Sequence, residues 1–183
     1  MQSVRVHAAP DAAWGASFGI LCAFEVLEHI EDDREALARW RTCLKPGGVQ
    51  LLSVPAHVSL WTVGDEWAGH FRRYGRTALC RLLSDAGFSV ERFECYGFPL
   101  TNLSERLSAP SYARRIHRNG GRVQHDRRRN NDRSGIDRGP HLKLYPLLRS
   151  FPGKLALRIC LAVQHAFIRT DLGSGYLVKA RRT

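Results

Sequence analysis

The sequence predicts an α/β protein built around a strand, a helix and a second strand. Residues 18–24 form a short apolar run, long enough for a strand that is buried on both faces. A helical pattern opens at Asp32 and ends at Gly47-Gly48, and the apolar residues 49–54 predict the next strand. Two strands joined by a helix form a right-handed βαβ unit, so we expect these strands to be parallel.

The predicted helix has a defined start and a defined face. Asp32 caps it, and Glu35 follows three residues later as a capping-box partner. Leu37, Trp40 and Leu44 recur at i, i+3 and i+7, which places them on one face, toward the sheet. Ligands of open α/β sheets bind beyond the carboxyl ends of the strands. The polar residues that follow the first strand are therefore expected at the functional edge.

Length and composition indicate one globular domain. The chain has 183 residues, enough to bury a substantial core. No stretch approaches the ~20 consecutive apolar residues of a membrane-spanning helix, and the N-terminus lacks the pattern of a signal peptide. The five cysteines are widely spaced and form no CxxC pair, which favours reduced thiols over disulfides or a zinc site. We therefore expect a cytoplasmic protein with no integral membrane segment.

The formal net charge of +11 is concentrated in one segment. Nine arginines and three aspartates lie between residues 114 and 138, which accounts for +6 of the total. Clustered arginines bind phosphate backbones without sequence preference, but this segment lacks the interleaved aromatics that stack on bases. We interpret it as a flexible, solvated insert and do not expect nucleic acid as a partner.

Three further elements follow along the chain. Thr77 is expected to cap a helix that ends at Gly87, and residues 88–96 predict a partly exposed strand. Residues 100–113 are compatible with a helix. A last amphipathic helix of about four turns is predicted near the C-terminus, and we expect it to pack on the core in preference to a membrane surface. Its predicted inner stripe consists of Leu155, Ile159, Ala162, Val163 and Phe167.

Five segments in order and spacing resemble class I S-adenosylmethionine-dependent methyltransferases, in the group that includes the ubiquinone-type O-methyltransferases. The segments are FEVLEHIEDD, LKPGG, LLSVPAH, GHFRRY and LLSDAGF. The resemblance covers roughly residues 18–100 and the closing strand GYLVKAR. It implies S-adenosylmethionine as cofactor and methyl transfer to a small-molecule acceptor.

The resemblance also implies a Rossmann-like sheet with strand order 3-2-1-4-5-7-6 and helices on both faces. The first two strands, with the glycine-rich cofactor loop between them, have no counterpart in this sequence, so the fold class expected is a partial sheet of strands 3 to 7. One wall of the cofactor pocket is then missing, and an unpaired edge there is a folding liability. Strands 3 to 7 correspond to Val4–Ala8, Phe18–Phe24, Val49–Val54, Phe88–Tyr96 and Tyr176–Ala180.

The missing motif has three explanations: a start codon assigned too far downstream, a decayed gene remnant, or a second chain that supplies the rest. We expect one of the first two. Residues 1–113 then form the C-terminal part of a methyltransferase domain, 114–139 the insert, and 140–183 a helical segment and the final strand. The alternative function is a non-catalytic remnant or binding module whose basic insert contacts nucleic acid or an acidic partner.

Two histidines are candidates for catalysis. Methyl transfer requires donor and acceptor to be aligned, and an oxygen or nitrogen acceptor also benefits from a base within hydrogen-bond reach. His70, in the irregular stretch after the second strand of the βαβ unit, is the first candidate, and His29 is the second. The structural alternative is that His29 bonds to the backbone and His70 tethers a lid.

The segment directly after the first strand is expected to face the cofactor. Phe24, Glu25 and Val26 are predicted to line its pocket. Glu25, Glu28 and His29 would share one face of a helical turn, a pattern that some ubiquinone-type relatives use for a divalent metal. We predict no metal, because the same residues occur in relatives that need none.

Arg72, Arg73 and Tyr74 are candidates for binding an anionic acceptor. Arginine pairs bidentately with carboxylate or phosphate, which suits such a role. Equally, one arginine could pair with Asp65 or Glu66 and serve the structure alone.

Overall fold

The computed structural model describes residues 14–118 and 145–183. The predicted third strand, Val4–Ala8, lies outside the described residues. So does most of the insert expected at 114–139, although its first residues, 114–118, are helical.

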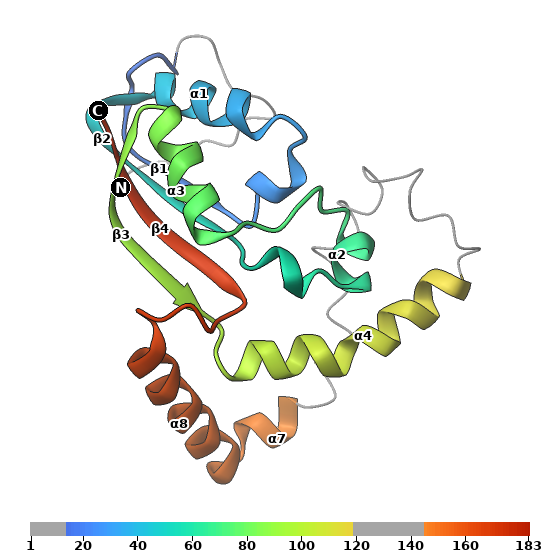
Figure 1. Ribbon diagram of the computed structural model, residues 1–183. Helices are drawn as coiled ribbons and strands as arrows, with labels where there is room; N and C mark the ends of the chain where they lie inside the picture. The colour runs from blue at the N-terminus through green and yellow to red at the C-terminus, as the bar shows by residue number, and fades with distance from the viewer. Residues whose placement is uncertain (1–13, 119–144) are drawn as a thin grey trace.

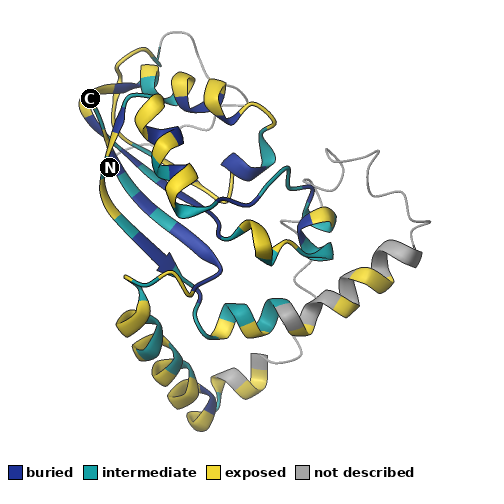
Figure 2. Cartoon of the chain, viewed as in Figure 1, coloured by how far each residue is buried: buried dark blue, intermediate teal, exposed yellow. Residues whose placement is uncertain are grey.

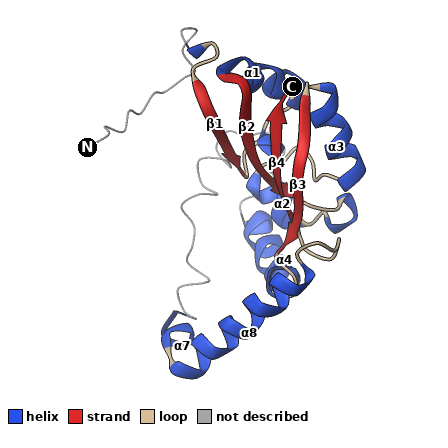
Figure 3. Ribbon diagram, turned by 90° about the vertical axis from the view of Figure 1, so that its left-hand side faces the viewer, coloured by secondary structure: helices blue, strands red, loops and turns tan. Residues whose placement is uncertain are grey.

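The centre of the fold is a four-stranded open sheet with order β1-β2-β4-β3 (Figure 3). β1 and β2 are parallel, and β4 runs antiparallel to both of its neighbours. This order is the 4-5-7-6 part of the expected sheet, so the predicted α/β topology is confirmed for these strands. The strands span Phe18–Phe24 (β1), Leu44–Pro55 (β2), Phe88–Tyr96 (β3) and Gly175–Arg182 (β4).

Six α-helices and two short 3-10 helices connect or extend the strands in the described ranges. They are η2 (Leu27–His29), α1 (Asp33–Cys43), η3 (Val58–Leu60), α2 (Val63–Ala68), α3 (Arg76–Asp85), α4 (Leu100–Arg118), α7 (Tyr145–Arg149) and α8 (Phe151–Phe167). None of the described helices is both long and apolar enough to cross a membrane.

The hydrophobic core lies between the sheet and the helices α1 and α3 (Figure 1). Leu37 of α1 and Leu83 of α3 are fully buried there, against Leu52 and Val178 of the two central strands. Figure 2 shows the same arrangement as buried residues on the inner sides of both helices. The predicted start of α1 is confirmed, since the side chain of Asp32 accepts a 2.8 Å hydrogen bond from the Glu35 amide.

The end of α1 differs from the prediction. The helix ends at Cys43, and β2 begins at Leu44, before the glycines that were expected to stop the helix. Pro46 explains the early end, because the residue before a proline is driven toward extended backbone and the proline itself has no amide to donate. Leu44 is buried as predicted, but as the first residue of a strand and not as part of the helix face.

β1 is buried on only one face, so the prediction of a strand buried on both faces was wrong. Ala23 points into the core, whereas Phe18, Ile20, Cys22 and Phe24 alternate with the inward positions and are exposed. No described element covers that face of β1. The apolar run predicted the strand correctly, but it could not show whether other elements pack against both faces of that strand.

Two helices also depart from their predicted limits or caps. Gly75, not Thr77, is the N-cap of α3, and Thr77 lies inside the first turn. Gly87 follows the end of α3 with a φ of +79°, as a helix-terminating glycine should. α4 begins at Leu100 as predicted but continues beyond residue 113, through Pro110, to Arg118.

α8 presents a different face inward from the one predicted. The residues of the predicted stripe are mostly exposed, with Ile159 at 57% exposure. The half-buried positions are Leu157, Cys160, Val163 and Gln164, so only Val163 of the predicted stripe is among them. The carboxamide of Gln164 accepts a 3.0 Å hydrogen bond from the Gly97 amide, which fixes this side of the helix against the end of β3.

Candidate functional site

The carboxyl ends of β1 and β2 lie side by side because the two strands are parallel. Glu25, the first residue after β1, has a φ of +53°, which a residue with a Cβ adopts only at a cost of about 1–3 kcal/mol. Its amide donates to the Ser53 carbonyl at 3.0 Å, and its Oε1 accepts from the Ser53 hydroxyl at 2.8 Å. A further bond of 2.6 Å comes from the Tyr96 hydroxyl. The carboxylate is thus held in one place at the strand ends.

The two residues that flank Glu25 present apolar surface at the same edge. Phe24 is 52% exposed and Val26 is 40% exposed. The three residues predicted to line a cofactor pocket therefore lie together and are accessible, with a fixed carboxylate between two apolar side chains.

Glu28 is a buried carboxyl group next to this edge. It is completely inaccessible, and neither of its oxygens accepts a hydrogen bond from a described residue. Burial, reinforced by the negative charge of Glu25, raises the pKa of Glu28 to about 8. A protonated Glu28 can donate to Glu25, whereas two carboxylates would repel each other. Carboxyl groups shifted into the neutral range are frequent at functional sites.

His70 is oriented by a buried aspartate. Its Nδ1 lies 3.0 Å from Oδ1 of Asp65, on α2. Burial alone would raise the pKa of Asp65, but hydrogen bonds from His70 and Arg73 and the charge of Arg73 hold it below the usual range. An ionised carboxylate can only accept, so His70 donates from Nδ1, and in the neutral ring Nε2 carries the lone pair. This is the arrangement of a carboxylate-oriented general base.

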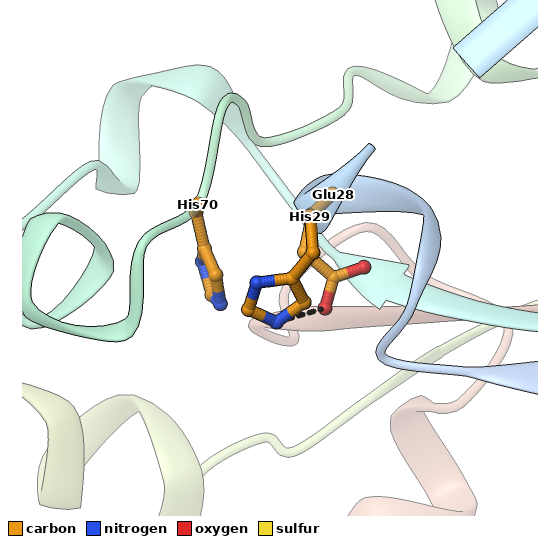
Figure 4. Close-up of side chains that lie close together, drawn as sticks. All are labelled: Glu28, His29 and His70. Atoms are coloured by element: carbon orange, nitrogen blue, oxygen red, sulfur yellow. Dashed lines mark ion pairs between the residues drawn. The ribbon is translucent and has the colours of Figure 1, made fainter. Parts of the chain in front are cut away.

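His29 lies directly against His70 (Figure 4). The two ring centroids are 4.7 Å apart and the ring planes meet at 80°. Nε2 of His29 is 3.8 Å from the Glu28 carboxyl. Glu28, His29 and His70 thus bring three possible metal ligands within 4.8 Å of one another. The sequence suggested Glu25, Glu28 and His29 as such a group. In the structure His70 takes the place of Glu25, because the Glu25 carboxylate is hydrogen-bonded to Ser53 and Tyr96.

Arg72, Arg73 and Tyr74 all have partners within the chain. Arg72 donates a 2.8 Å bond to Asp33 and a second bond to the Glu31 carbonyl. The Tyr74 hydroxyl, which is buried, bonds to the same Asp33 carboxylate at 3.1 Å.

Arg73 is buried and forms the pairing with Asp65 that the sequence offered as the structural alternative. Its Nε donates to Asp65 at 2.7 Å, and its Nη2 reaches Glu105 of α4 at 3.2 Å. Of the two arginines, Arg72 has the more exposed side chain, at 36% against 5% for Arg73. Arg73 and Tyr74 therefore stabilise the fold, Arg73 through Asp65 and Glu105 and Tyr74 through Asp33.

The first half of the chain is similar to a known protein family. Residues 3–92 match the family described as a methyltransferase domain. This match spans just under half of the chain, and it marks residues 3–92 as similar to a methyltransferase domain. A protein of Mycolicibacterium smegmatis, described as a probable S-adenosylmethionine-dependent methyltransferase, is 33% identical over 78 residues. That match covers 42% of this chain and 30% of the relative, so the chain spans less than a third of the relative's length.

Solved methyltransferase structures resemble the chain at low identity. An S-adenosylmethionine-dependent methyltransferase from Mesorhizobium loti has a TM-score of 0.47 at 13% identity, over 92% of this chain and 63% of the other. The phosphoethanolamine N-methyltransferase 2 of Haemonchus contortus, in complex with S-adenosyl-L-methionine, has a TM-score of 0.44 at 16% identity, over 92% and 34% of the respective chains.

Three polar residues at this edge were not predicted from the sequence as site residues. Asp65 orients His70, and Ser53 and Tyr96 hold Glu25. Asp65 carried a weak signal, since it precedes the histidine by one helical turn and a half. Ser53 and Tyr96 carried none, because only the pairing of β1 with β2 and the end of β3 brings them to residue 25.

Proposed function

We propose that this chain takes part in S-adenosylmethionine-dependent methyl transfer to a small-molecule acceptor. The observation that carries the proposal is the methyltransferase-domain match over residues 3–92, together with the His70–Asp65 pair at its carboxyl edge. The alternative, a non-catalytic binding module, gains no support from this match.

Phe24, Glu25 and Val26 are the residues proposed to contact the cofactor. They fit one wall of such a site, because the exposed side chains of Phe24 and Val26 offer apolar contact on either side of a carboxylate held by Ser53. S-adenosylmethionine supplies a methyl group activated by its positively charged sulfur. Glu25 would complement that charge from a fixed position, without reorganisation during the reaction.

His70 is proposed as the general base. Nε2 would accept the proton of an acceptor hydroxyl or amine, while Asp65 stabilises the imidazolium and fixes the ring. His29, in ring contact with His70, is proposed as the second catalytic residue, which would take the proton from His70 and release it to solvent. For the group Glu28, His29 and His70 we keep the prediction of no metal.

Acceptor binding by Arg72, Arg73 and Tyr74 stays a prediction. Arg72 has the more exposed side chain and donor groups beyond its bonds to Asp33 and Glu31, so it is the residue best suited to an anionic acceptor. Arg73 and Tyr74 would contribute by holding the segment in place.

Calorimetric titration with S-adenosylmethionine tests the function directly. The chain is compared with a version extended by about 70 residues encoded upstream, roughly two βα units. Saturable binding by either protein supports the proposal, and binding by the longer one alone assigns the missing pocket wall to the added residues. Absence of binding by both overturns it.

The role of His70 is tested with His70→Asn. The asparagine amide keeps a donor for Asp65 but removes the basic Nε2. We expect methyl transfer from labelled S-adenosylmethionine to a panel of hydroxyl and amine acceptors to fall about 10²–10⁴-fold, with cofactor affinity unchanged. An unchanged turnover would rule out His70 as the base.

A further inference from the structure

A second group of ligand-type side chains lies at the carboxyl edge, apart from the histidine pair. His57 follows β2, Cys95 lies in β3 and Asp171 lies in the loop before β4. One donor atom from each is within 4.8 Å of the other two. The three residues are distant in sequence and meet only because β4 lies between β2 and β3.

His57 is held with one ring nitrogen directed into this group. The residue has a φ of +58°, an unusual conformation for a side chain with a Cβ. Its Nδ1 faces the Tyr176 hydroxyl at 3.5 Å, and the two rings are in edge contact with centroids 5.5 Å apart. Its Nε2 is buried, has no hydrogen-bond partner among the described residues, and lies 3.8 Å from Oδ1 of Asp171. Metal-binding histidines commonly show this division, with the second nitrogen facing an orienting polar group.

Cys95 presents its sulfur to the same point. The side chain is buried, and Sγ accepts a 3.1 Å hydrogen bond from the Gly173 amide. A Cβ at residue 173 would lie 2.1 Å from the Tyr96 carbonyl oxygen, so only glycine lets the loop approach this closely. Burial raises the pKa of the Cys95 thiol to about 11. A metal ion deprotonates a coordinating thiol, and the proton is released to solvent.

We propose that His57, Cys95 and Asp171 bind one zinc ion. Imidazole nitrogen, thiolate sulfur and carboxylate oxygen are the donors that zinc takes in proteins, at about 2.0–2.3 Å. Three atoms no farther apart than 4.8 Å share a centre within about 2.8 Å of each, so shifts of less than about 1 Å bring all three to bonding distance. Asp171 is half exposed, which leaves a fourth position for water from the solvent side.

The ion would fasten the loop before β4 to the sheet. The loop is already tied at both ends, since Ile168 accepts a bond from the Cys95 amide and the Ser174 amide donates to Tyr96. A zinc ion bound by Asp171 would also hold the middle of this loop, and it would link the loop to His57 in the segment that follows β2. The sequence predicted no zinc site because it has no CxxC pair. That argument does not apply to a site with a single cysteine.

The test uses cobalt(II) as a spectroscopic substitute for zinc. The metal-free 183-residue protein is titrated with Co²⁺ and then with Zn²⁺. We expect one equivalent to bind with a thiolate-to-cobalt charge-transfer band and intense tetrahedral visible bands, and Zn²⁺ to remove both. Thermal unfolding should shift to higher temperature with Zn²⁺, because the ion binds the folded state.

Variants assign the donors. Cys95→Ser should abolish the charge-transfer band, and the exposed Asp171→Asn should weaken zinc binding more than tenfold, since even outer-shell changes cost that much. Cys160→Ser, on α8, is the matched control and should leave the spectrum unchanged. If Cys95→Ser does not fold, the wild-type spectrum and Asp171→Asn decide the question.

Two results would overturn the proposal. One is no cobalt binding by the wild-type protein. The other is binding without a thiolate band that survives Asp171→Asn and is lost in His70→Asn, which would place the ion at Glu28, His29 and His70. Neither result depends on methyl transfer, so this site stands or falls separately from the proposed activity.

Discussion

Glu28 shows most clearly how burial changes the chemistry of a single residue. Its carboxyl group is inaccessible, lies beside Glu25 and contacts His29 at 3.8 Å. A pKa of about 8 in the folded chain, against 4.5 for an ordinary glutamate, means that the folded state binds a proton that the unfolded state has already released. This shift of the Glu28 pKa therefore costs stability as the pH rises.

The stability of the folded chain should fall between pH 4.5 and pH 8 because of this group. The contribution is fully retained below pH 4.5, where both states are protonated, and is lost as the pH rises through the folded-state pKa of about 8. Each pH unit in this window removes at most about 1.4 kcal/mol. Glu28→Gln should flatten the slope, as measured by denaturant unfolding at several pH values. The exposed Glu66→Gln serves as control, and equal slopes for wild type and Glu28→Gln would contradict the prediction.

At the scale of elements, the amphipathic helices α1 and α8 differ in how far their apolar residues are buried. Both carry apolar residues at helical spacing, yet α1 buries Leu37 completely whereas α8 leaves Ile159 and Leu155 exposed. The difference arises because α1 crosses over the sheet between two parallel strands. α8 is instead held at the end of β3 through Gln164 and through the contact of Phe167 with Phe98.

Truncation of the two helix faces should therefore have unequal effects. Ile159→Ala, on the exposed face of α8, should change the free energy of unfolding by less than about 0.5 kcal/mol. Leu37→Ala, on the buried face of α1, should cost about 2–5 kcal/mol, because it removes packed apolar atoms and leaves a cavity. Chemical denaturation measures both. A cost above 2 kcal/mol for Ile159→Ala would mean that this face is covered in solution.

At the scale of the whole molecule, the two outer strands of the described sheet are protected differently. The outer strand β3 carries Glu91 and Arg92, and Glu91 pairs with Lys179 and Arg181 of β4. β1 has no charged residue, and Ile20 on it is 62% exposed. Charges on an outer strand oppose edge-to-edge association, so β1 is the side at risk.

The chain should self-associate through β1 in a concentration-dependent way. Ile20→Lys places a charge on the exposed face of that strand and should shift sedimentation or light-scattering profiles toward the monomer. Ser89→Lys, at an exposed position of β3, is the matched control and should have no effect. If both variants behave like the wild type, β1 is not the contact surface.

Local patterns predicted much of this fold. The limits of β1 and β3, the cap at Asp32 and the position of β4 all followed from short-range signals of hydrophobicity and capping. His70 and His29 were also identified as a pair of candidates. Their contact with each other and with Glu28 could not be predicted, because it depends on how α2 and η2 meet beyond the sheet.

What the sequence by itself determined is the four described strands, the helices α1, α3, α4 and α8, the α/β class and the resemblance to a methyltransferase family. Each depends on periodicities and motifs that lie within a few residues of one another. Only the tertiary structure decided which apolar faces are covered, and it alone joined Asp65 to His70 and His57 to Cys95 and Asp171. Those contacts depend on strand order and on the layers packed against each strand, and neither is encoded in a local pattern.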